Sequence, residues 1–310
     1  MKNEIYEIPF RAELCYIKNK GIILPENVPY LGMGASYIAS CVFKSIGVKI
    51  FPEMASEYYY YLHRYSNYEN GVLVSQSGLS SDTLWCATHF KSFVNISNNP
   101  DSTLSKLPHC SKTISLHAGK EYLIPTKTYI NTLLVMYLGF GFDPLPVLEI
   151  YKNRIVEFKK IGVEMAGLIY KRIKKNKLNG IYILGNGPNF ATAQHASLVI
   201  SEITKKPVLA MTCAQYDHGH KETARNSVVI AINHFENVSY ERTNQLLRTV
   251  KKSGGEVFEL NTALTEEQYS PLTFSIPFFF ASEFLAQKLN ITNPFEIGNK
   301  ITKSNLSDQQ

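Results

Sequence analysis

The feature that most constrains the fold is a segment that occurs twice, once in each half of the chain. The segments YLGMGASYIAS (30–40) and ILGNGPNFATA (183–193) both read as an apolar strand, a G-x-G turn and the start of a helix. Glycine permits the tight turn and the close backbone approach that such a strand-to-helix junction needs. Duplication of one β–α–β unit is the simplest account, so the 310 residues are predicted to form two similar domains.

Short strands that are apolar throughout alternate with helical segments in both halves. Strands are predicted at 28–34, 48–53, 71–78, 92–98, 112–119, 180–187, 207–211, 226–233 and 256–260. A strand without a polar face is typical of a parallel sheet that helices cover on both sides. The predicted class is therefore α/β.

The segment GFDPLPVL (141–148) is the best candidate for a domain boundary. Its two prolines and an aspartate follow a long apolar helix, predicted from about Pro125 to Phe140, and new helical periodicity begins after them. One face of the next helix is expected to carry six apolar residues: Ile155, Phe158, Ile161, Met165, Leu168 and Ile169.

Composition and charge exclude several classes of protein. No apolar run reaches the length of about 18 residues that a membrane span requires, and acids and a proline occupy the N-terminus where a signal peptide needs an apolar core. The net charge of +6 is mostly local to 171–177, at the end of a predicted helix, where cations suit the helix dipole. These features favour a soluble, cytosolic protein that binds neither membrane nor nucleic acid.

The five cysteines are odd in number and contain no C-x-x-C pair, which argues against a disulfide framework and against a cysteine-built zinc site. The Asp–His–Gly–His loop at 217–220 places its histidines too close together for easy ligation of one ion, and other ligands are not evident. No metal or cofactor is expected.

The segment VLVSQSGLSSDT (72–83) carries five hydroxyl side chains within nine positions, directly after a buried strand. Ligands of open α/β sheets bind at this end of the strands, and hydroxyls together with helix-terminal amides can satisfy the oxygens of a phosphate. N-capping is the structural alternative, but it needs only one hydroxyl, at Ser80 or Ser81. The cluster is interpreted as a phosphate cradle.

A dinucleotide site is the weaker interpretation of the glycine turns. The dinucleotide fingerprint needs a third glycine, and that position holds Tyr37 in one copy and Phe190 in the other. Glu53 does lie at the end of the second predicted strand, where a ribose-binding acid would sit. A nicotinamide oxidoreductase rests on these features alone and ranks last.

The combination of YLGMGASY with LVSQSGLSSDT resembles the sugar isomerase (SIS) domain. The likeness covers nearly the whole chain and extends to the isomerase half of glutamine–fructose-6-phosphate amidotransferase and related glucosamine-6-phosphate deaminases. Further landmarks occur in the right order: KNEIYEIP (2–9), MASEYYYY (54–61), AGKEYLIPTKTY (118–129), SEITKKP (201–207), YDHGH (216–220) and NPFEIGNKITKS (293–304). The resemblance implies two tandem flavodoxin-like SIS domains, at 21–150 and 151–310, after an N-terminal helical segment at 1–20.

The resemblance also implies a site. It assigns the substrate phosphate to Ser36, Ser75, Gln76, Ser77 and Ser80, in the first domain. It places Glu202 as the catalytic base, His218 as the ring-opening group, commonly reached from a partner subunit, and Lys300 near the substrate. The partners that the resemblance implies are a small-molecule sugar phosphate and a second copy of the chain, in a homodimer with a shared active site.

Three positions depart from the amidotransferase pattern. Val199 stands where that enzyme has the lysine that forms an imine with the ketose, and a valine cannot form a Schiff base. His195 replaces a second acid on the same helix, either as an acid–base group or as a packed residue. Leu79 replaces an acid in the serine cluster.

An aldose–ketose isomerase or an amino-sugar-phosphate deaminase acting on a hexose or hexosamine 6-phosphate is the leading hypothesis. No glutaminase domain precedes the isomerase segment, so this chain is not expected to make ammonia from glutamine. A sugar-phosphate sensor that kept the serines and lost the chemistry is the competing hypothesis.

Overall fold

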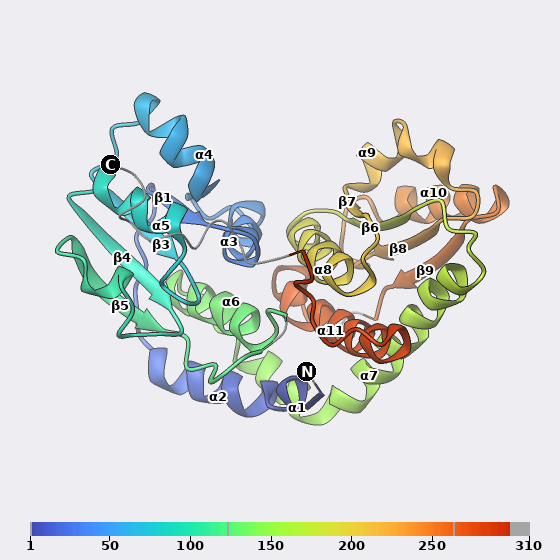
Figure 1. Cartoon of the computed structure of the whole chain (residues 1–310), viewed down its shortest axis with the longest axis horizontal. Coiled ribbons are helices and arrows are strands. Elements are labelled where there is room, and N and C mark those ends of the chain that lie inside the picture. The colour runs from blue at the N-terminus through green and yellow to red at the C-terminus, as the bar shows by residue number, and fades with distance from the viewer. Residues whose placement is uncertain (1, 123, 263, 298–310) are drawn as a thin grey trace. The chain divides into compact units, whose positions relative to one another are not determined.

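The computed structural model of the protein describes residues 2–122, 124–262 and 264–297 and divides the chain into two compact units (Figure 1). The first domain is built on Glu7–Leu145 and the second on Pro146–Pro294, so the division falls inside the GFDPLPVL segment. Each unit is an α/β structure with its own parallel sheet, which confirms the predicted fold class.

The sheet of the first domain has the strand order β2-β1-β3-β4-β5, with every neighbouring pair parallel. The order 2-1-3-4-5 is that of flavodoxin-like folds. All five predicted strands are present: β1 (Pro29–Gly32), β2 (Phe51–Met54), β3 (Asn70–Val74), β4 (Ser92–Ser97) and β5 (Cys110–Ser115). The four residues of β1 and the last four of β3 are buried, which explains their uniformly apolar sequences.

The helices of the first domain are α2 (Ile8–Asn19), α3 (Ala35–Ser45), α4 (Ala55–Tyr60), α5 (Ser81–Cys86) and α6 (Lys127–Gly139). Short 3₁₀ helices occupy Leu62–Tyr65, Ala87–His89 and Leu104–Lys106. Helix α5 ends at Cys86, although apolar and helix-compatible residues continue to Phe90. The chain turns there to lay the ring of Phe90 over Gly71 of β3, where a Cβ atom would lie 2.6 Å from the ring. Packing on the sheet thus overrides the local helical pattern.

The second domain repeats this plan with one strand fewer in the described residues. Its strands β6 (Ile181–Gly185), β7 (Val208–Met211), β8 (Val228–Ile232) and β9 (Glu256–Leu260) form a parallel sheet of order β7-β6-β8-β9. Its helices are α1 (Lys2–Tyr6), α7 (Leu145–Lys174), α8 (Pro188–Thr204), α9 (Cys213–Asp217), α10 (Tyr240–Lys252) and α11 (Ser270–Leu289), with 3₁₀ turns at His220–Thr223 and Glu267–Tyr269. The matching strand order supports the duplication inferred from the two G-x-G segments.

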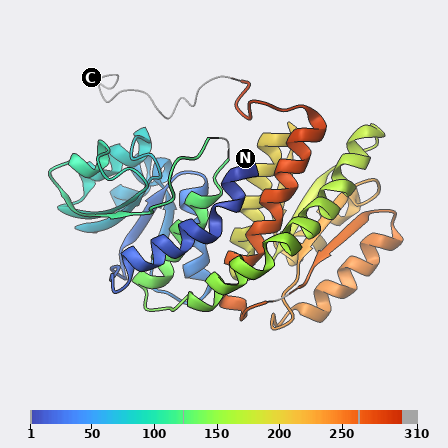
Figure 2. The same cartoon turned by 90° about the horizontal axis from the view of Figure 1, so that it is seen from below.

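Three long helices of the second domain, α8, α11 and α7, lie side by side (Figure 2). Sixteen residues of α11 are buried, from Ser270 to Ala286. None of the helices in the described part of the chain combines the length and the apolar character needed to cross a bilayer.

The buried stripe of α7 differs from the predicted one. Phe158, Met165 and Ile169 are buried as expected, whereas the other three apolar positions, Ile155, Ile161 and Leu168, are only partly buried. The buried face of α7 includes Gly162, because the absence of a side chain there lets α7 approach the backbone of α11. A Cβ atom on Gly162 would lie 2.3 Å from the carbonyl oxygen of Pro277.

We expect Gly162→Ala to destabilise the second domain by about 1–3 kcal/mol, since the added methyl group meets main-chain atoms that cannot move aside. Gly167→Ala on the same helix is the matched control, because a Cβ atom there meets nothing within 4 Å. This control should raise stability by about 0.5–1 kcal/mol through helix propensity. Urea unfolding of both variants measures the difference, and equal stability of the two would contradict the close approach of α7 and α11.

Candidate functional site

The candidate site begins where two neighbouring strands of the first sheet end. From β1 the chain leads to the edge strand β2, whereas from β3 it leads to β4 on the other side of the sheet. Helices that leave such a pair diverge, and the crevice between them is the usual ligand site of an open parallel sheet. The register pairs Gly32 with Val74, so the G-x-G turn and the residues Ser75–Ser80, here termed the serine loop, leave the sheet side by side.

The G-x-G turn brings Ser36 to this edge. Gly34 precedes α3 with a φ of 52°, a conformation that favours glycine. A Cβ atom on Gly32 would lie 2.9 Å from the Cβ atom of Ser36, so the strand and the first turn of the helix are in close contact. Ser36 therefore sits in the first turn of an 11-residue helix, where the dipole favours an anion.

The serine loop is held by its own hydroxyl groups. The Ser75 hydroxyl accepts from the N–H of Gly78 at 3.1 Å, and the Ser77 hydroxyl accepts from the N–H of Leu79 at 3.3 Å. Gly78 has a φ of 64°, and a Cβ atom there would lie 2.1 Å from the Ser102 hydroxyl. Only glycine fits this position, so the loop conformation is closely determined.

Three of the five predicted phosphate-binding side chains have polar groups that are available to a ligand. Ser80 occupies the N-cap position of α5, and its carbonyl accepts from the N–H of Leu84 at 2.9 Å, but its hydroxyl makes no capping bond. Within the described residues, the side chains of Ser36, Gln76 and Ser80 have no hydrogen-bond partner. N-capping therefore does not account for the hydroxyl of Ser80.

Two residues that sequence reasoning missed, Ser97 and Asn98, fasten the serine loop to the next strand. The Ser97 hydroxyl and the N–H of Asn98 donate to the carbonyl of Gln76, at 3.2 and 3.0 Å. The Asn98 amide then accepts from the N–H of Ala118 at 2.9 Å and donates to the carbonyl of Gly119 at 2.8 Å. The run of polar residues after the apolar part of SFVNISNN was the available signal.

Glu121 organises the landmark segment 118–129. Its carboxylate accepts from the N–H groups and the hydroxyls of both Thr126 and Thr128, at the start of α6. Burial raises the pKa of this carboxyl group, and the four donors oppose that shift. Lys127, between the two threonines, is also buried and forms an ion pair of 2.7 Å with Glu7. This segment is thus a buried polar network that fixes the beginning of α6.

In the second domain, α8 carries three of the singled-out positions on one face, at spacings of four and three residues. Glu202 is half-buried in the last turn, and its apolar neighbours Val199, Ile200 and Ile203 are buried. His195 is 1% exposed, and its ring lies perpendicular to that of Phe279 at 5.7 Å between centroids. Such packing is typical of a structural histidine.

His218 is exposed at the end of α9, and Lys300 lies outside the described residues. Lys205 donates to the main-chain carbonyl of Pro294 at 2.6 Å. The structure thus brings Ser36 and the serine loop together in the first domain and aligns His195, Val199 and Glu202 in the second.

The fold is shared with several solved structures. It matches that of glucosamine-6-phosphate deaminase from Thermotoga maritima with a TM-score of 0.76 and 16% identity, over 94% of this chain and 95% of that one. It matches the C-terminal domain of glucosamine-fructose-6-phosphate aminotransferase from Francisella tularensis with a TM-score of 0.75 and 21% identity, over 93% and 95% of the two chains. The predicted resemblance to the sugar isomerase family is confirmed.

Sequence comparison leads to the same group of proteins. The chain is 24% identical, over 237 residues, to glutamine–fructose-6-phosphate aminotransferase [isomerizing] 1 of Arabidopsis thaliana. The aligned region covers 69% of this chain and 34% of that protein. The chain spans about a third to a half of the length of the curated relatives it matches. No family model matches the chain. In this double sugar isomerase fold, the serine loop belongs to the first domain and the α8 face to the second.

We expect Asn98→Ala to destabilise the first domain by about 1–3 kcal/mol, because it leaves the N–H of Ala118 and the carbonyl of Gly119 without their partner. The matched control is Asn99→Ala, at an exposed neighbour whose side chain, among the described residues, accepts only from the N–H of Asp101. Chemical denaturation monitored by circular dichroism compares the two. If Asn99→Ala proved the more damaging change, the role given to Asn98 would be wrong.

Proposed function

We propose that this protein is an enzyme of sugar-phosphate metabolism, an aldose–ketose isomerase or an amino-sugar-phosphate deaminase acting on a hexose or hexosamine 6-phosphate. One observation carries the proposal. A loop with uncommitted hydroxyl groups lies at the switch point of the first sheet, beside the N-terminus of α3. The names of the relatives agree with it, since they include a glucosamine-6-phosphate deaminase and fructose-6-phosphate aminotransferases.

The proposed phosphate cradle consists of Ser36 from α3 with Ser75, Gln76, Ser77 and Ser80 of the serine loop. A phosphate ester has three terminal oxygens, which hydroxyl groups, an amide and helix-terminal N–H groups can satisfy with short charge-assisted hydrogen bonds. The rigid turn at Gly78 supports this role, because a preformed loop loses little entropy when the ester binds.

Glu202 is the proposed base. Isomerisation moves a proton between C2 and C1 of the open-chain sugar, and deamination of a 2-amino sugar needs the same transfer before water replaces the nitrogen at C2. A half-buried carboxylate on a packed helix can be held in position for this transfer. His218 is proposed to open the sugar ring and Lys300 to lie near the substrate.

Val199 directs the proposal away from full amidotransferase chemistry. Its side chain is buried and cannot form an imine, so a reaction that begins by attaching nitrogen to a ketose lacks its usual nucleophile. Isomerisation and deamination do not need that lysine, because no new nitrogen is added. The burial of His195 against Phe279 favours a packed role over direct acid–base work.

A sugar-phosphate sensor is the second candidate, and the same Val199 favours it. Such a protein would keep the serine loop and bind the ester without turnover. By the family resemblance we also propose a homodimer in which His218 completes the partner's site. The exposure of His218 is compatible with that arrangement.

Incubation with glucosamine 6-phosphate, fructose 6-phosphate and glucose 6-phosphate separates these functions. Release of ammonia identifies a deaminase, and interconversion of aldose and ketose without ammonia identifies an isomerase. Thermal stabilisation by a sugar phosphate without turnover identifies a sensor, since a ligand that binds only the folded state raises its stability. If none of the three sugar phosphates is turned over or stabilises the protein, the proposed function is wrong.

We expect Glu202→Gln to lower kcat by about 10²–10⁴-fold, because the amide cannot accept the proton from carbon. Its affinity for the sugar phosphate should stay close to that of the parent, since the serine loop is unchanged. Glu241→Gln, an exposed acid on α10, removes the same charge elsewhere in the domain and serves as the control. Turnover that survives in Glu202→Gln would refute the base assignment.

We expect Ser77→Ala to raise KM by about tenfold or more, the size of one hydrogen bond to a charged oxygen, with a smaller effect on kcat. Ser45→Ala, on the exposed side of α3, is the matched control. Steady-state kinetics of both variants provide the test. An unchanged KM in Ser77→Ala would remove that residue from the proposed cradle.

A further inference from the structure

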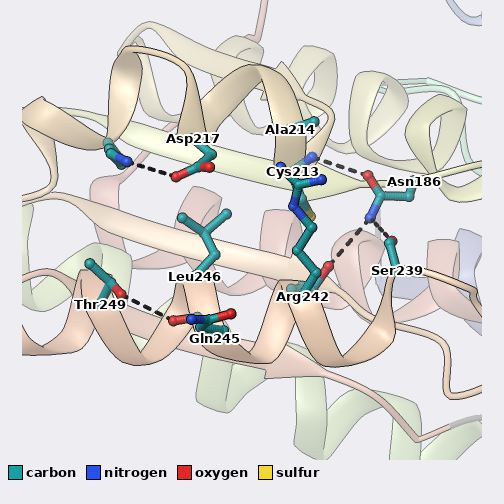
Figure 3. Close-up of a pocket in the computed structure, with 11 residues that line it drawn as sticks. Asn186, Cys213, Ala214, Asp217, Ser239, Arg242, Gln245, Leu246 and Thr249 are labelled. Atoms are coloured by element: carbon teal, nitrogen blue, oxygen red, sulfur yellow. Dashed lines mark hydrogen bonds and ion pairs between the residues drawn. The ribbon is translucent and has the colours of Figure 1, made fainter.

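A pocket of about 280 Å³ lies within the second domain, between α9 and α10 (Figure 3). It opens beside the carboxyl end of β6, the strand from which the chain leads to β7 on one side while β8 lies on the other. None of the residues that line it belongs to the serine loop or to helix α8. The corresponding helices of the first domain are α4 and α5, which follow β2 and β3.

The end of the pocket next to β6 is a preformed polar wall. Asn186 follows the strand directly, and its side-chain oxygen accepts from the N–H of Cys213 at 3.1 Å. Its amide nitrogen donates to the hydroxyl of Ser239 at 2.8 Å and to that of Thr243 at 3.4 Å. These bonds tie the first residues of α9 and α10 to the strand, so the walls are held apart at a defined width.

Helix α10 presents one face to the pocket. Arg242, Gln245, Leu246 and Thr249 all line it, at the spacing i, i+3, i+4 and i+7 of a single helix face. Leu246 is buried against Cys213 and gives the pocket an apolar floor. The mixture of an apolar floor and a few directed polar groups is typical of small-molecule sites.

The charges in the pocket do not cancel. Asp217 forms an ion pair of 2.8 Å with Lys221, and the hydrogen bond from Lys221, together with the positive charges of Lys221 and Arg242, lowers the pKa of the Asp217 carboxyl group. Arg242 has no hydrogen-bonded or ion-paired acceptor within residues 2–122, 124–262 and 264–297. Its side chain rises from α10 across the pocket toward Cys213 and Asn186 (Figure 3). One positive charge thus points into the pocket without a counter-charge of its own.

We infer that this pocket binds a small oxyanion-bearing molecule, a phosphate ester or a carboxylate, through the guanidinium of Arg242. The planar fork of arginine donates two parallel hydrogen bonds to either group. The volume is near the lower end of the usual range for ligand pockets, about 300–1,000 Å³, so the ligand is a compact metabolite and not a nucleotide. The site is separate from the proposed substrate site and does not depend on it.

Methyl and arginine side-chain NMR of the full chain, titrated separately with inorganic phosphate and with acetate, tests the inference. We expect the signals of Leu246 and Arg242 to shift with saturation below roughly 10 mM, the range expected for one oxyanion contact. A comparison of the phosphate and acetate titrations shows which oxyanion the guanidinium of Arg242 binds more tightly. The same shifts should occur in Ser77→Ala, because that change lies in the other domain and disturbs only the proposed substrate site.

Arg242→Gln should weaken the binding by about tenfold or more, while Arg248→Gln should leave it unchanged. Arg248 is the matched control because it lies on the same helix, carries the same charge and does not line the pocket. Absence of saturable shifts at Leu246 with either anion, or equal affinity in Arg242→Gln and the parent protein, would overturn the inference. A result of this kind would leave the proposed sugar-phosphate function standing, since that function is measured at the serine loop.

Discussion

The serine loop depends on a residue that has no side chain. Gly78 adopts a left-handed conformation, and the Ser102 side chain occupies the space that a Cβ atom on Gly78 would need, so any other residue would move the loop. The carbonyl of Gly78 also accepts from the N–H of Leu104, so the tight turn is attached to the segment after β4. Contacts within the chain therefore determine the conformation of the serine loop.

Support for that turn extends across three strand ends. Ser97 and Asn98 attach the loop to the end of β4, and the Asn98 side chain reaches the chain that follows β5. The buried carboxylate of Glu121 then fixes the start of α6. The bonds of Ser97 and Asn98 thus join the ends of β3 and β4 to the chain after β5, and such buried polar networks stiffen the loop that they support.

The two domains use one fold with different chemistry at corresponding edges. After β1 the G-x-G turn leads to Ser36, whereas after β6 the same turn carries Asn186, which joins α9 to α10. Where the first domain offers hydroxyl groups, the second offers the guanidinium of Arg242. Helix α9 both lines the second pocket and continues into His218, the proposed ring-opening residue. The two proposed ligand positions are not equivalent, because the serine loop lies beside the start of α3, whereas the pocket of the second domain lies between α9 and α10.

By itself, the sequence was enough to predict the α/β class, all nine strands and the position of the serine loop, because these follow from local periodicity and from glycine at sharp turns. It could not predict that the helix after the loop ends at Cys86, that Gly162 faces α11, or that Ser97 and Asn98 hold the loop. Nor could it predict the pocket beside Arg242. Each of these depends on residues far apart in the chain, and only the packed structure decides which distant atoms meet.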